Sequence, residues 1–435
     1  MANNANPTNA DVVIVGGGIV GCTAALYLAK RGLAVVLFEA DEIGRAQSGR
    51  NWGFIRQQGR DPSELPMMME SSRIWANAEK ELGVDFEWTR GGNLAIAATP
   101  EKMSLFEDWS RVAREHKLDT ELVSPAKLRT LIPDMRGDWE GAMYTASDAH
   151  AEPRKATQAF CAAARAAGAR VFEHCAVDRI ETQNGAVSAV WTQKGRIKTS
   201  SVIGAAGAWA AKLLRPLDLN LPVRWVRSSV VRIKPLRPIT NLAVWAPGVS
   251  FSQRRDGSLK LGGGGWTDFD FTLDSLRDVR LFMPNYWVNR KLFQLHIGKP
   301  LLLDLLARLP GSKEGRHPFS APWTTDPPPN PAKMSRVLSE FRRMFPAIGD
   351  VTMIDSWAGY MDATPDALPV LDSIEKPRGL VLATGLSGHG FGLGPIVGRL
   401  AAELVTEGKT SFDIKPFRFS RFKETGYKPK PRSVL

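Results

Sequence analysis

Three glycines with GxGxxG spacing, Gly16, Gly18 and Gly21, form the pattern in this chain that is best suited to bind phosphate groups. Gly16 permits a tight turn, Gly18 lets a pyrophosphate approach the backbone, and Gly21 lets the next helix pack closely on a sheet. Glu39 follows Gly21 by 18 residues, where its carboxylate can accept hydrogen bonds from ribose hydroxyls and would repel a 2′-phosphate. These residues predict a dinucleotide site.

The elements around these glycines have the order that such a site requires. Residues 12–15 are apolar and β-branched and predict a buried strand, residues 19–31 have helical periodicity, and residues 34–38 predict a second strand. The N-terminus of the helix would offer free N–H groups and the positive end of its dipole to the phosphates.

A second glycine-rich turn between a strand and a helix occurs near the other end of the chain. Residues 380–383 predict a strand, residues 385–394 contain five glycines, and a helix then extends to about Glu407, before Gly408. A second turn of this kind favours a cofactor too long for one phosphate cradle. Between the two turns, we expect a helix over 154–167 and short strands over 170–173, 176–180, 187–192, 196–199 and 201–205.

The rest of the chain predicts a different architecture. Residues 85–150 and 220–270 mix short strands with frequent tryptophans, which is typical of an antiparallel sheet over a pocket. Leu302, Leu305, Leu306 and Leu309 share one helical face, before the prolines at 327–329. We therefore predict an α/β composite, with a Rossmann-like domain from residues 1–84, 151–219 and 355–435. A substrate domain takes residues 85–150 and 220–354, with a helical insertion at about 274–330.

Composition and charge limit the classes of partner. The net charge is +12, and residues 409–435 hold eight Lys or Arg residues against Asp413 and Glu424, which suits either a solubilising tail or contact with an acidic surface. Three scattered cysteines indicate neither a disulfide framework nor a metal site, and no segment resembles a nucleic-acid module. The uncharged segment 12–29 is better explained by strand and helix than by a membrane span. We expect a cytoplasmic protein, either free or peripheral to the inner face of the membrane, and an oligomer is compatible with the sequence.

The chain resembles the FAD-dependent amine and amino-acid oxidoreductases of the D-amino-acid oxidase superfamily. The segments that carry the resemblance are DVVIVGGGIVG with Glu39, SSVIGAAGAWAAKLL at 200–214, AGYMDATPDALPVL at 358–371 and TGLSGHGFGLGPIVGRLAAEL at 384–404. EIGRAQSGRNWGF and the insertion are closer to the bacterial L-amino-acid deaminases, and opine oxidases belong to the same superfamily. The resemblance implies oxidation of an amine by hydride transfer to FAD, which gives an imine that hydrolyses to a keto acid or aldehyde.

The resemblance also assigns the cofactor contacts. Arg45, Gln47, Ser48 and Gly49 would line the flavin, while Val177, Ala206, Gly207 and Trp209 would lie along the ADP half. Gly388, His389, Gly390, Phe391 and Gly392 would hold the pyrimidine end of the flavin ring, where N–H groups stabilise the charge of the reduced form. Some relatives attach the flavin to a cysteine before the TPD motif; residues 355–364 contain none, so we expect non-covalent FAD.

Substrate contacts are expected from residues of suitable shape and charge. Where the deaminases carry a carboxylate-binding arginine, this chain has Ser252, so we expect Arg56, Arg254 or Arg255 to supply the charge. Arg56 with Gln57 and Gln58 could recognise a carboxylate or an amide. His389 could face the flavin ring, either as a structural donor or in proton transfer. Tyr360 or Met361 would form a pocket wall, and Trp52 and Phe251 are aromatic candidates.

The electron acceptor is open at this stage. Sarcosine-type oxidases use a lysine above the flavin to activate oxygen, and the corresponding segment LGGGGWTDFDF contains no lysine. This favours an acceptor other than oxygen, and the chain could also be one subunit of a multi-chain opine or amine dehydrogenase. The insertion and the basic tail would then contact a membrane or a partner protein.

Overall fold

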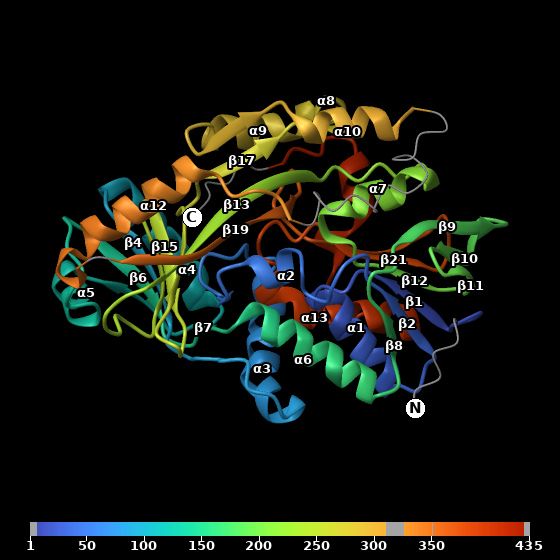
Figure 1. Cartoon of the computed structure of the whole chain (residues 1–435), viewed down its shortest axis with the longest axis horizontal. Helices are drawn as coiled ribbons and strands as arrows, with labels where there is room; N and C mark the ends of the chain where they lie inside the picture. Colours follow the sequence, from blue (N-terminus) through green and yellow to red (C-terminus); the bar gives the residue numbers. More distant parts are fainter. Residues whose placement is uncertain (1–6, 310–325, 350, 430–435) are drawn as a thin grey trace.

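The computed structural model describes residues 7–309, 326–349 and 351–429. Two large sheets organise the chain, a six-stranded sheet that begins with the N-terminal strand and a ten-stranded sheet (Figure 1). The fold is therefore the mixed α/β composite that the sequence predicted.

The six-stranded sheet has the order β20-β21-β12-β1-β2-β8. All neighbouring strands are parallel except β20 and β21. Its strands are β1 (Val12–Val15), β2 (Val35–Phe38), β8 (Arg170–Phe172), β12 (Val202–Gly204), β20 (Val370–Ile374) and β21 (Leu380–Thr384). The sheet thus joins strands from three separate parts of the chain, residues 12–38, 170–204 and 370–384.

Helices cover one face of this sheet, and a smaller sheet packs toward the other. The helices are α1 (Ile19–Lys30), α3 (Leu65–Leu82), α6 (Pro153–Ala166) and α13 (Gly390–Glu407). The small antiparallel sheet contains β9 (Val177–Gln183), β10 (Ala186–Thr192) and β11 (Gly195–Lys198), next to α7 (Ala210–Leu214). Both faces are thus buried, as parallel strands of Val and Ile require.

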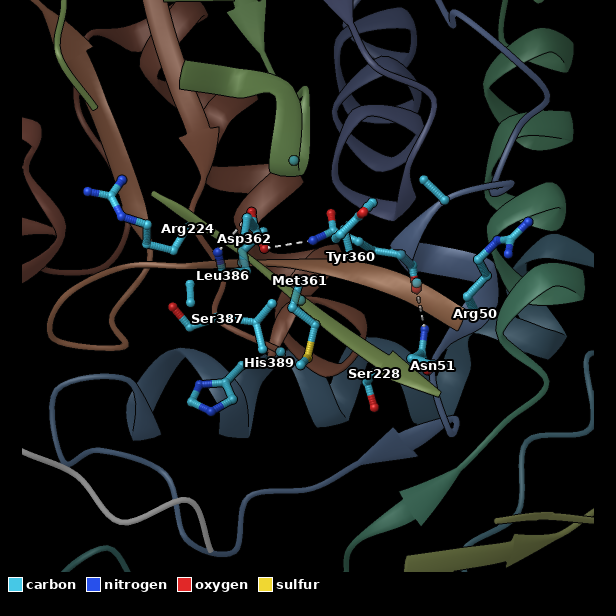
Figure 2. Close-up of a pocket in the computed structure, with 18 of the residues that line it drawn as sticks. Arg50, Asn51, Arg224, Ser228, Tyr360, Met361, Asp362, Leu386, Ser387 and His389 are labelled. Carbon is cyan, nitrogen blue, oxygen red and sulfur yellow. Dashed lines mark hydrogen bonds between the residues drawn. The ribbon is translucent and has the colours of Figure 1, made fainter. Parts of the chain in front are cut away.

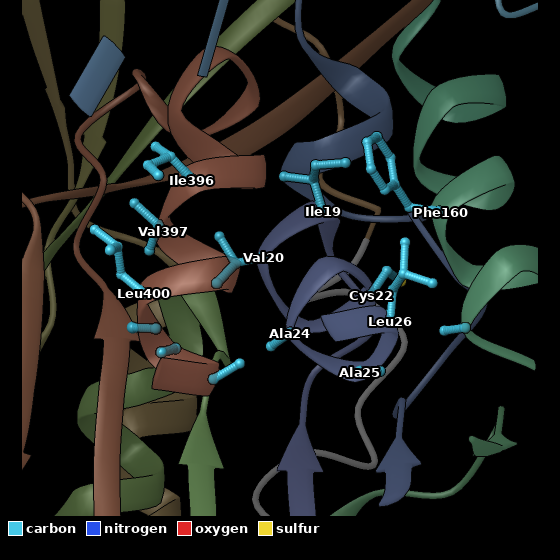
Figure 3. Packing of buried hydrophobic residues seen from close by; sticks show 14 of the residues in the cluster. Ile19, Val20, Cys22, Ala24, Ala25, Leu26, Phe160, Ile396, Val397 and Leu400 are labelled. Atoms are coloured by element: carbon cyan, nitrogen blue, oxygen red, sulfur yellow. The ribbon is translucent and has the colours of Figure 1, made fainter. Parts of the chain in front are cut away.

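Helix α1 lies between α6 and α13, as Figure 3 shows for Ile19, Val20 and Phe160. Glycines on α13 make the contact close. A Cβ atom on Gly398 would lie 2.7 Å from the carbonyl oxygen of Val20, and one on Gly394 would lie 2.4 Å from Cγ2 of Ile19. The helix pair consequently brings the N-terminus of α13 beside the N-terminus of α1.

The ten-stranded sheet has the order β18-β17-β13-β16-β15-β14-β4-β6-β5, with β19 paired to β13. Most of its pairs are antiparallel, with β14–β4 and β17–β18 as the parallel exceptions. Its strands are β4 (Asn93–Ala97), β5 (Thr120–Val123), β6 (Gly141–Thr145), β13 (Arg224–Lys234), β14 (Ala243–Ala246), β15 (Val249–Gln253), β16 (Leu259–Gly262), β17 (Thr267–Asp270), β18 (Phe293–His296) and β19 (Thr352–Ala363).

Short elements connect the two sheets. β3 (Phe54–Ile55) pairs with β7 (Ala149–His150), and α2 (Gln47–Arg50) precedes β3. α4 (Pro100–Glu115), α5 (Pro125–Leu131) and α12 (Pro331–Met344) pack on the large sheet. α2 and β3 belong to the segment that carries the predicted flavin-lining residues. The fold places this segment between the two sheets.

The predicted insertion forms α8 (Leu273–Arg277), α9 (Val279–Asn289) and α10 (Lys299–Ala307) along one edge of the molecule (Figure 1). It is not purely helical, because β18 pairs in parallel with β17 and extends the large sheet. Residues 310–325 of the predicted insertion lie outside the described residues. The leucine face remains exposed on α10, where Leu302 is 56% and Leu305 is 45% accessible.

We predict that Gly398→Ala destabilises the protein by about 1–3 kcal/mol, the usual cost of overpacking a core. Its new Cβ would meet backbone atoms of α1, which cannot move as a side chain can. Gly298→Ala is the matched control, since no atom lies within 4 Å of that Cβ and its φ of −167° is extended backbone. Urea denaturation measures both variants, and equal midpoints would contradict the close contact.

Candidate functional site

One cavity of about 720 Å³ extends from the six-stranded sheet to the ten-stranded sheet. Val15 and Phe38 line it from the carboxyl ends of β1 and β2, which is where open α/β sheets bind ligands. Val226 on β13, Phe269 on β17 and the residues 359–363 of β19 line its opposite side. The cavity therefore connects the predicted cofactor region with the predicted substrate region.

The first glycine turn lies at the base of this cavity. Gly16 and Gly18 line it, and a Cβ on Gly16 would lie 2.4 Å from the carbonyl oxygen of Ala205. Gly21 lies behind the turn, where its Cβ would be 2.0 Å from the carbonyl oxygen of Gly16. Gly18 caps α1 without a side-chain hydrogen bond, and Ser48 accepts the N–H of Ile19 at 2.9 Å. Ser48 thus occupies the first N–H of the helix, and the N–H groups that follow it remain for a phosphate.

Glu39 lines the cavity at the end of β2, close to Gly17. Its Oε2 accepts the N–H of Gly17 at 2.6 Å, and its Oε1 accepts the N–H of Asp41 at 2.9 Å. Burial raises the pKa of Glu39, and these two hydrogen bonds oppose that rise. Each carboxylate oxygen keeps a second lone pair, so the side chain can still accept from a ribose. Val177 lines the same cavity.

The second glycine turn enters the cavity from α13. Gly388, His389, Gly390 and Phe391 line the cavity, and His389 caps the helix without a side-chain hydrogen bond. Gly392 does not line it; a Cβ there would lie 3.2 Å from Cε of Met68. Two helix N-termini therefore face one cavity, as a cofactor with two anionic regions requires.

Asp362 holds the second turn in place, and sequence reasoning missed it. Its Oδ2 accepts the N–H groups of Gly385 at 2.8 Å and Leu386 at 3.2 Å, and Oδ1 accepts from Nε2 of Gln47 at 3.0 Å (Figure 2). Burial raises the pKa of Asp362. The carboxylate thereby links the predicted flavin-lining loop to the glycine turn, and its position before the TPD motif was the available signal.

The remaining predicted cofactor residues divide into two groups. Arg45, Gln47, Ser48, Ala206, Gly207 and Trp209 line the cavity. Gly49 does not, because it packs against the preceding turn, with its Cβ position 2.0 Å from the carbonyl oxygen of Gly44. The same contact explains why that position needs glycine.

These residues fit FAD. Glycines occupy positions where a Cβ would fill the cradle or strike its backbone, a buried carboxylate lies at one end, and an uncapped helix begins at the other. Among the described residues lining the cavity there is no cysteine, and Cys22, Cys161 and Cys175 are buried elsewhere. In the part of the chain that the structure describes, no cluster of His, Cys, Asp or Glu could hold a metal ion.

Arg56 lines the substrate side of the cavity after β3. Its Nη1 donates to the carbonyl oxygen of Gln58 at 2.6 Å, and its guanidinium lies 5.3 Å from the ring centroid of Trp245. Burial and the charge of Arg60 lower the pKa of Arg56 to about 9, so it is still cationic at neutral pH. Trp52 and Phe54 line the same region.

His389 and Met361 both line the cavity (Figure 2). Its Nδ1 is 3.2 Å from Oε1 of Glu64, a fully buried carboxylate that sequence reasoning missed. Burial and the nearby Arg60 lower the pKa of His389 to about 4, although Glu64 opposes this. The imidazole is therefore neutral at physiological pH, and Glu64 fixes its orientation.

Tyr360 forms cavity wall on β19, packed against Trp225 at 5.0 Å between ring centroids. Burial and the Asp270 carboxylate raise its pKa, so the phenol keeps its proton. Arg227 in turn donates to Asp270 at 3.0 Å. The structure gives Tyr360 a fixed position in the wall and no means to act as a base.

Gln58 does not line the cavity, which corrects the prediction that it contacts substrate. Its Nε2 donates to the carbonyl oxygen of Met143 at 2.9 Å and to Thr145 at 3.1 Å, and its Oε1 accepts from Asn93 at 2.6 Å. All of its hydrogen-bonding capacity holds the loop against β4 and β6. Gln57 is likewise bound to Asp148.

Three other substrate candidates also lie outside the cavity. Arg254 pairs with Glu87 and Arg255 with Asp85, so neither guanidinium is available to a ligand in the cavity. Phe251 is buried between Phe341 and Phe345. Ser252, which stands at the place of the arginine expected from the deaminases, donates to the carbonyl oxygen of Trp52 at 2.8 Å.

We predict that His389 stays neutral down to about pH 5, one unit above its pKa, where about 90% of the rings are unprotonated. Arg60→Gln should raise this pKa because it removes a nearby positive charge, and Glu64→Gln should lower it because it removes the negative one. Nitrogen-15 NMR of histidine-labelled protein measures the pKa of His389 in the parent and in both variants. The variant His389→Asn identifies its signal among those of the six histidines. A parent pKa near 6.5 would contradict the buried, neutral ring.

No helix in the described ranges is both long and apolar enough to cross a membrane.

Mitochondrial sarcosine dehydrogenase from Mus musculus is 25% identical over 427 residues, which is 96% of this chain and 42% of the relative. The chain thus spans less than half the length of that relative.

Two solved structures are similar over almost their whole length. L-amino acid deaminase from Proteus vulgaris has a TM-score of 0.90 and 25% identity, with 97% of this chain and 99% of that chain covered. L-amino acid deaminase from Proteus myxofaciens, in complex with anthranilate, has a TM-score of 0.89 and 26% identity, with 97% and 95% covered. The family model for FAD dependent oxidoreductases matches residues 11–404. With both glycine cradles in place and the match extending over most of its length, the chain belongs to the FAD dependent oxidoreductase family.

Proposed function

We propose that the chain oxidises the carbon next to the amine of an amino acid or a related secondary amine. The single observation that carries this proposal is the continuity of the cavity, which joins two dinucleotide cradles to a wall that holds Arg56 and aromatic rings. FAD, when bound, supplies the acceptor for the hydride that leaves this carbon. The amine loses a proton, and water hydrolyses the resulting imine to a keto acid or aldehyde.

The chain's own residues orient the substrate in this proposal. The Arg56 guanidinium binds the substrate carboxylate, and Trp52, Phe54 and Trp245 enclose the rest of the molecule. The described cavity wall contains no lysine and one histidine, which is neutral. Fixed placement of the C–H bond is therefore the main contribution, and such placement can lower a barrier by several kcal/mol.

We predict that amino acids bleach the bound flavin anaerobically, and that the amines derived from them by loss of the carboxylate do so far more slowly. The panel contains D- and L-amino acids, N-alkyl amino acids and opines, each with its decarboxylated partner where one exists. Arg56 is the reason for the difference, since it has no ion-pair partner among the described residues. Absence of bleaching by every member of the panel would contradict the proposal.

The same preparation tests the non-covalent state of FAD. We expect acid precipitation to release all of the flavin into the supernatant, because no described cysteine faces the cavity. A pellet that stays yellow would overturn this expectation.

We further propose that electrons leave to an acceptor at an anionic lipid surface, reached through the insertion. This insertion patch consists of the exposed apolar residues Leu276, Trp287, Val288, Ile297, Leu302, Leu305 and Leu309, which do not line the cavity. Arg280, Arg290, Lys291 and Lys299 are exposed in the same segment, and the carboxylates of Asp274, Asp278 and Asp304 are each paired with arginines. An apolar patch rimmed by cations fits anionic headgroups.

We expect the protein to sediment with vesicles of phosphatidylcholine and phosphatidylserine, and much less with phosphatidylcholine alone. The double variant Trp287→Glu, Leu302→Glu should lose this binding because it places negative charge in the patch. Leu236→Glu is the control, an equally apolar residue that is 83% exposed outside the patch. Sedimentation that depends neither on the anionic lipid nor on the patch would exclude this surface, and co-purification of a second polypeptide bound to it would favour the multi-chain dehydrogenase.

A further inference from the structure

Arg60 is a buried cation in the cavity wall that the proposed reaction does not use. It is 3% exposed, and its side chain lines the cavity next to Gly59. Its Nε donates to the carbonyl oxygen of Arg56 at 3.1 Å, but its Nη1 has no hydrogen-bond partner among the described residues. An unpartnered guanidinium N–H in a buried position is costly unless a ligand completes it.

Arg56 and Arg60 lie in the same wall, and neither forms an ion pair within the described residues. They are close enough that the charge of Arg60 contributes to the lowered pKa of Arg56. Two neighbouring like charges repel each other in a site of low dielectric constant. A ligand with two negative groups would remove that repulsion and satisfy both guanidinium groups.

The nearby carboxylates of Asp148 and Glu64 do not play the part of such a ligand. Asp148 and Glu64 influence both arginines, but neither lines the cavity. Asp148 accepts the backbone N–H groups of Gln57 and Gln58, and burial raises its pKa to about 6. Glu64 faces His389 through Oε1. Neither carboxylate therefore belongs to the cavity lining, whereas Arg56 and Arg60 do.

We propose that the substrate carries two carboxylates, one bound by Arg56 and the other by Arg60. This inference rests on the proposed amine oxidation and specifies its substrate class. The second carboxylate belongs either to the side chain of the amino acid or to the substituent of a secondary amine. The chemistry at the reacting carbon is the same in both cases: the C–H hydride goes to FAD and the amine proton to water, so that an imine forms.

Two matched pairs of substrates distinguish a second carboxylate on the amino-acid side chain from one on the amine substituent. Glutamate is compared with glutamine, which has nearly the same shape without the second charge. N-(carboxymethyl)alanine is compared with N-methylalanine, each as D and L forms. Anaerobic stopped-flow bleaching of the holoprotein gives the apparent dissociation constant and the limiting rate for each. We expect the dicarboxylate of one pair to bind at least about tenfold more tightly than its partner.

Substitution then assigns the preference to Arg60. Arg60→Gln should reduce the preference for the dicarboxylate over its monocarboxylate partner by about ten- to hundredfold, mainly through the dissociation constant of the dicarboxylate. Arg56→Gln should weaken both members of a pair. Arg73→Gln, an exposed arginine on α3 paired with Glu70, is the control.

A binding measurement without turnover completes the test. Glutarate and butyrate differ by one carboxylate and contain no amine to oxidise. Glutarate should perturb the visible flavin spectrum at lower concentration than butyrate, and Arg60→Gln should remove that difference. If Arg60→Gln does not fold or loses FAD, Arg60→Lys keeps one positive charge and should keep part of the preference.

The outcomes distinguish this inference from the proposed function. If amino acids bleach the flavin but neither dicarboxylate is preferred in the parent protein, the second carboxylate is excluded and amine oxidation stands. A preference that persists in Arg60→Gln excludes Arg60 as its cause. If no amine bleaches the flavin, the proposed function itself fails, and the glutarate measurement still decides whether the cavity binds two carboxylates.

Discussion

The close contact between α1 and α13 is the constraint on which the rest of the site depends. Gly394 and Gly398 let α13 approach the backbone of α1, although the two helices are separated by most of the chain. Each helix begins where a parallel strand of the same sheet ends, so both N-termini open into one cavity. The Asp362 carboxylate then joins the second turn to Gln47 of the flavin-lining loop. Cofactor binding thus requires three distant segments to be packed correctly.

The dinucleotide half could be predicted because its signals are local. A strand, a glycine turn, a helix and an acidic residue occur in sequence around Gly16, and each is set by nearest neighbours. The residues of the substrate half could not be predicted in this way, because strand pairing decides on which face of the sheet each residue lies. Phe251 and Ser252 are adjacent, yet one packs on Phe341 and the other on the backbone of Trp52. Arg60, four residues after Arg56 in the same loop, was a signal that could have been recognised.

The cavity surface and the layer behind it have opposite charge. The guanidinium groups of Arg56 and Arg60 line the cavity, whereas Asp148 and Glu64 lie behind them and hold the loop and the His389 ring. In the proposed substrate site, such a layer would help to hold the buried cations in a fixed orientation. Gln57 and Gln58, which look like ligand-binding amides in the sequence, instead donate their side-chain N–H groups within the protein, to Asp148 and to the carbonyl oxygen of Met143.

Helix α9 of the insertion has one face in the cavity wall and another on the exterior of the protein. Phe282, Met283 and Tyr286 of α9 line the cavity, while Trp287 and Val288 of the same helix are exposed. A surface that bound the outer face of α9 would therefore contact a helix that also forms part of the cavity wall. Coupling free energies are reciprocal, so any effect of that surface on substrate binding would be matched by an equal effect of substrate on binding to the surface. Under the proposed lipid attachment, α9 is the element through which the two binding events would be linked.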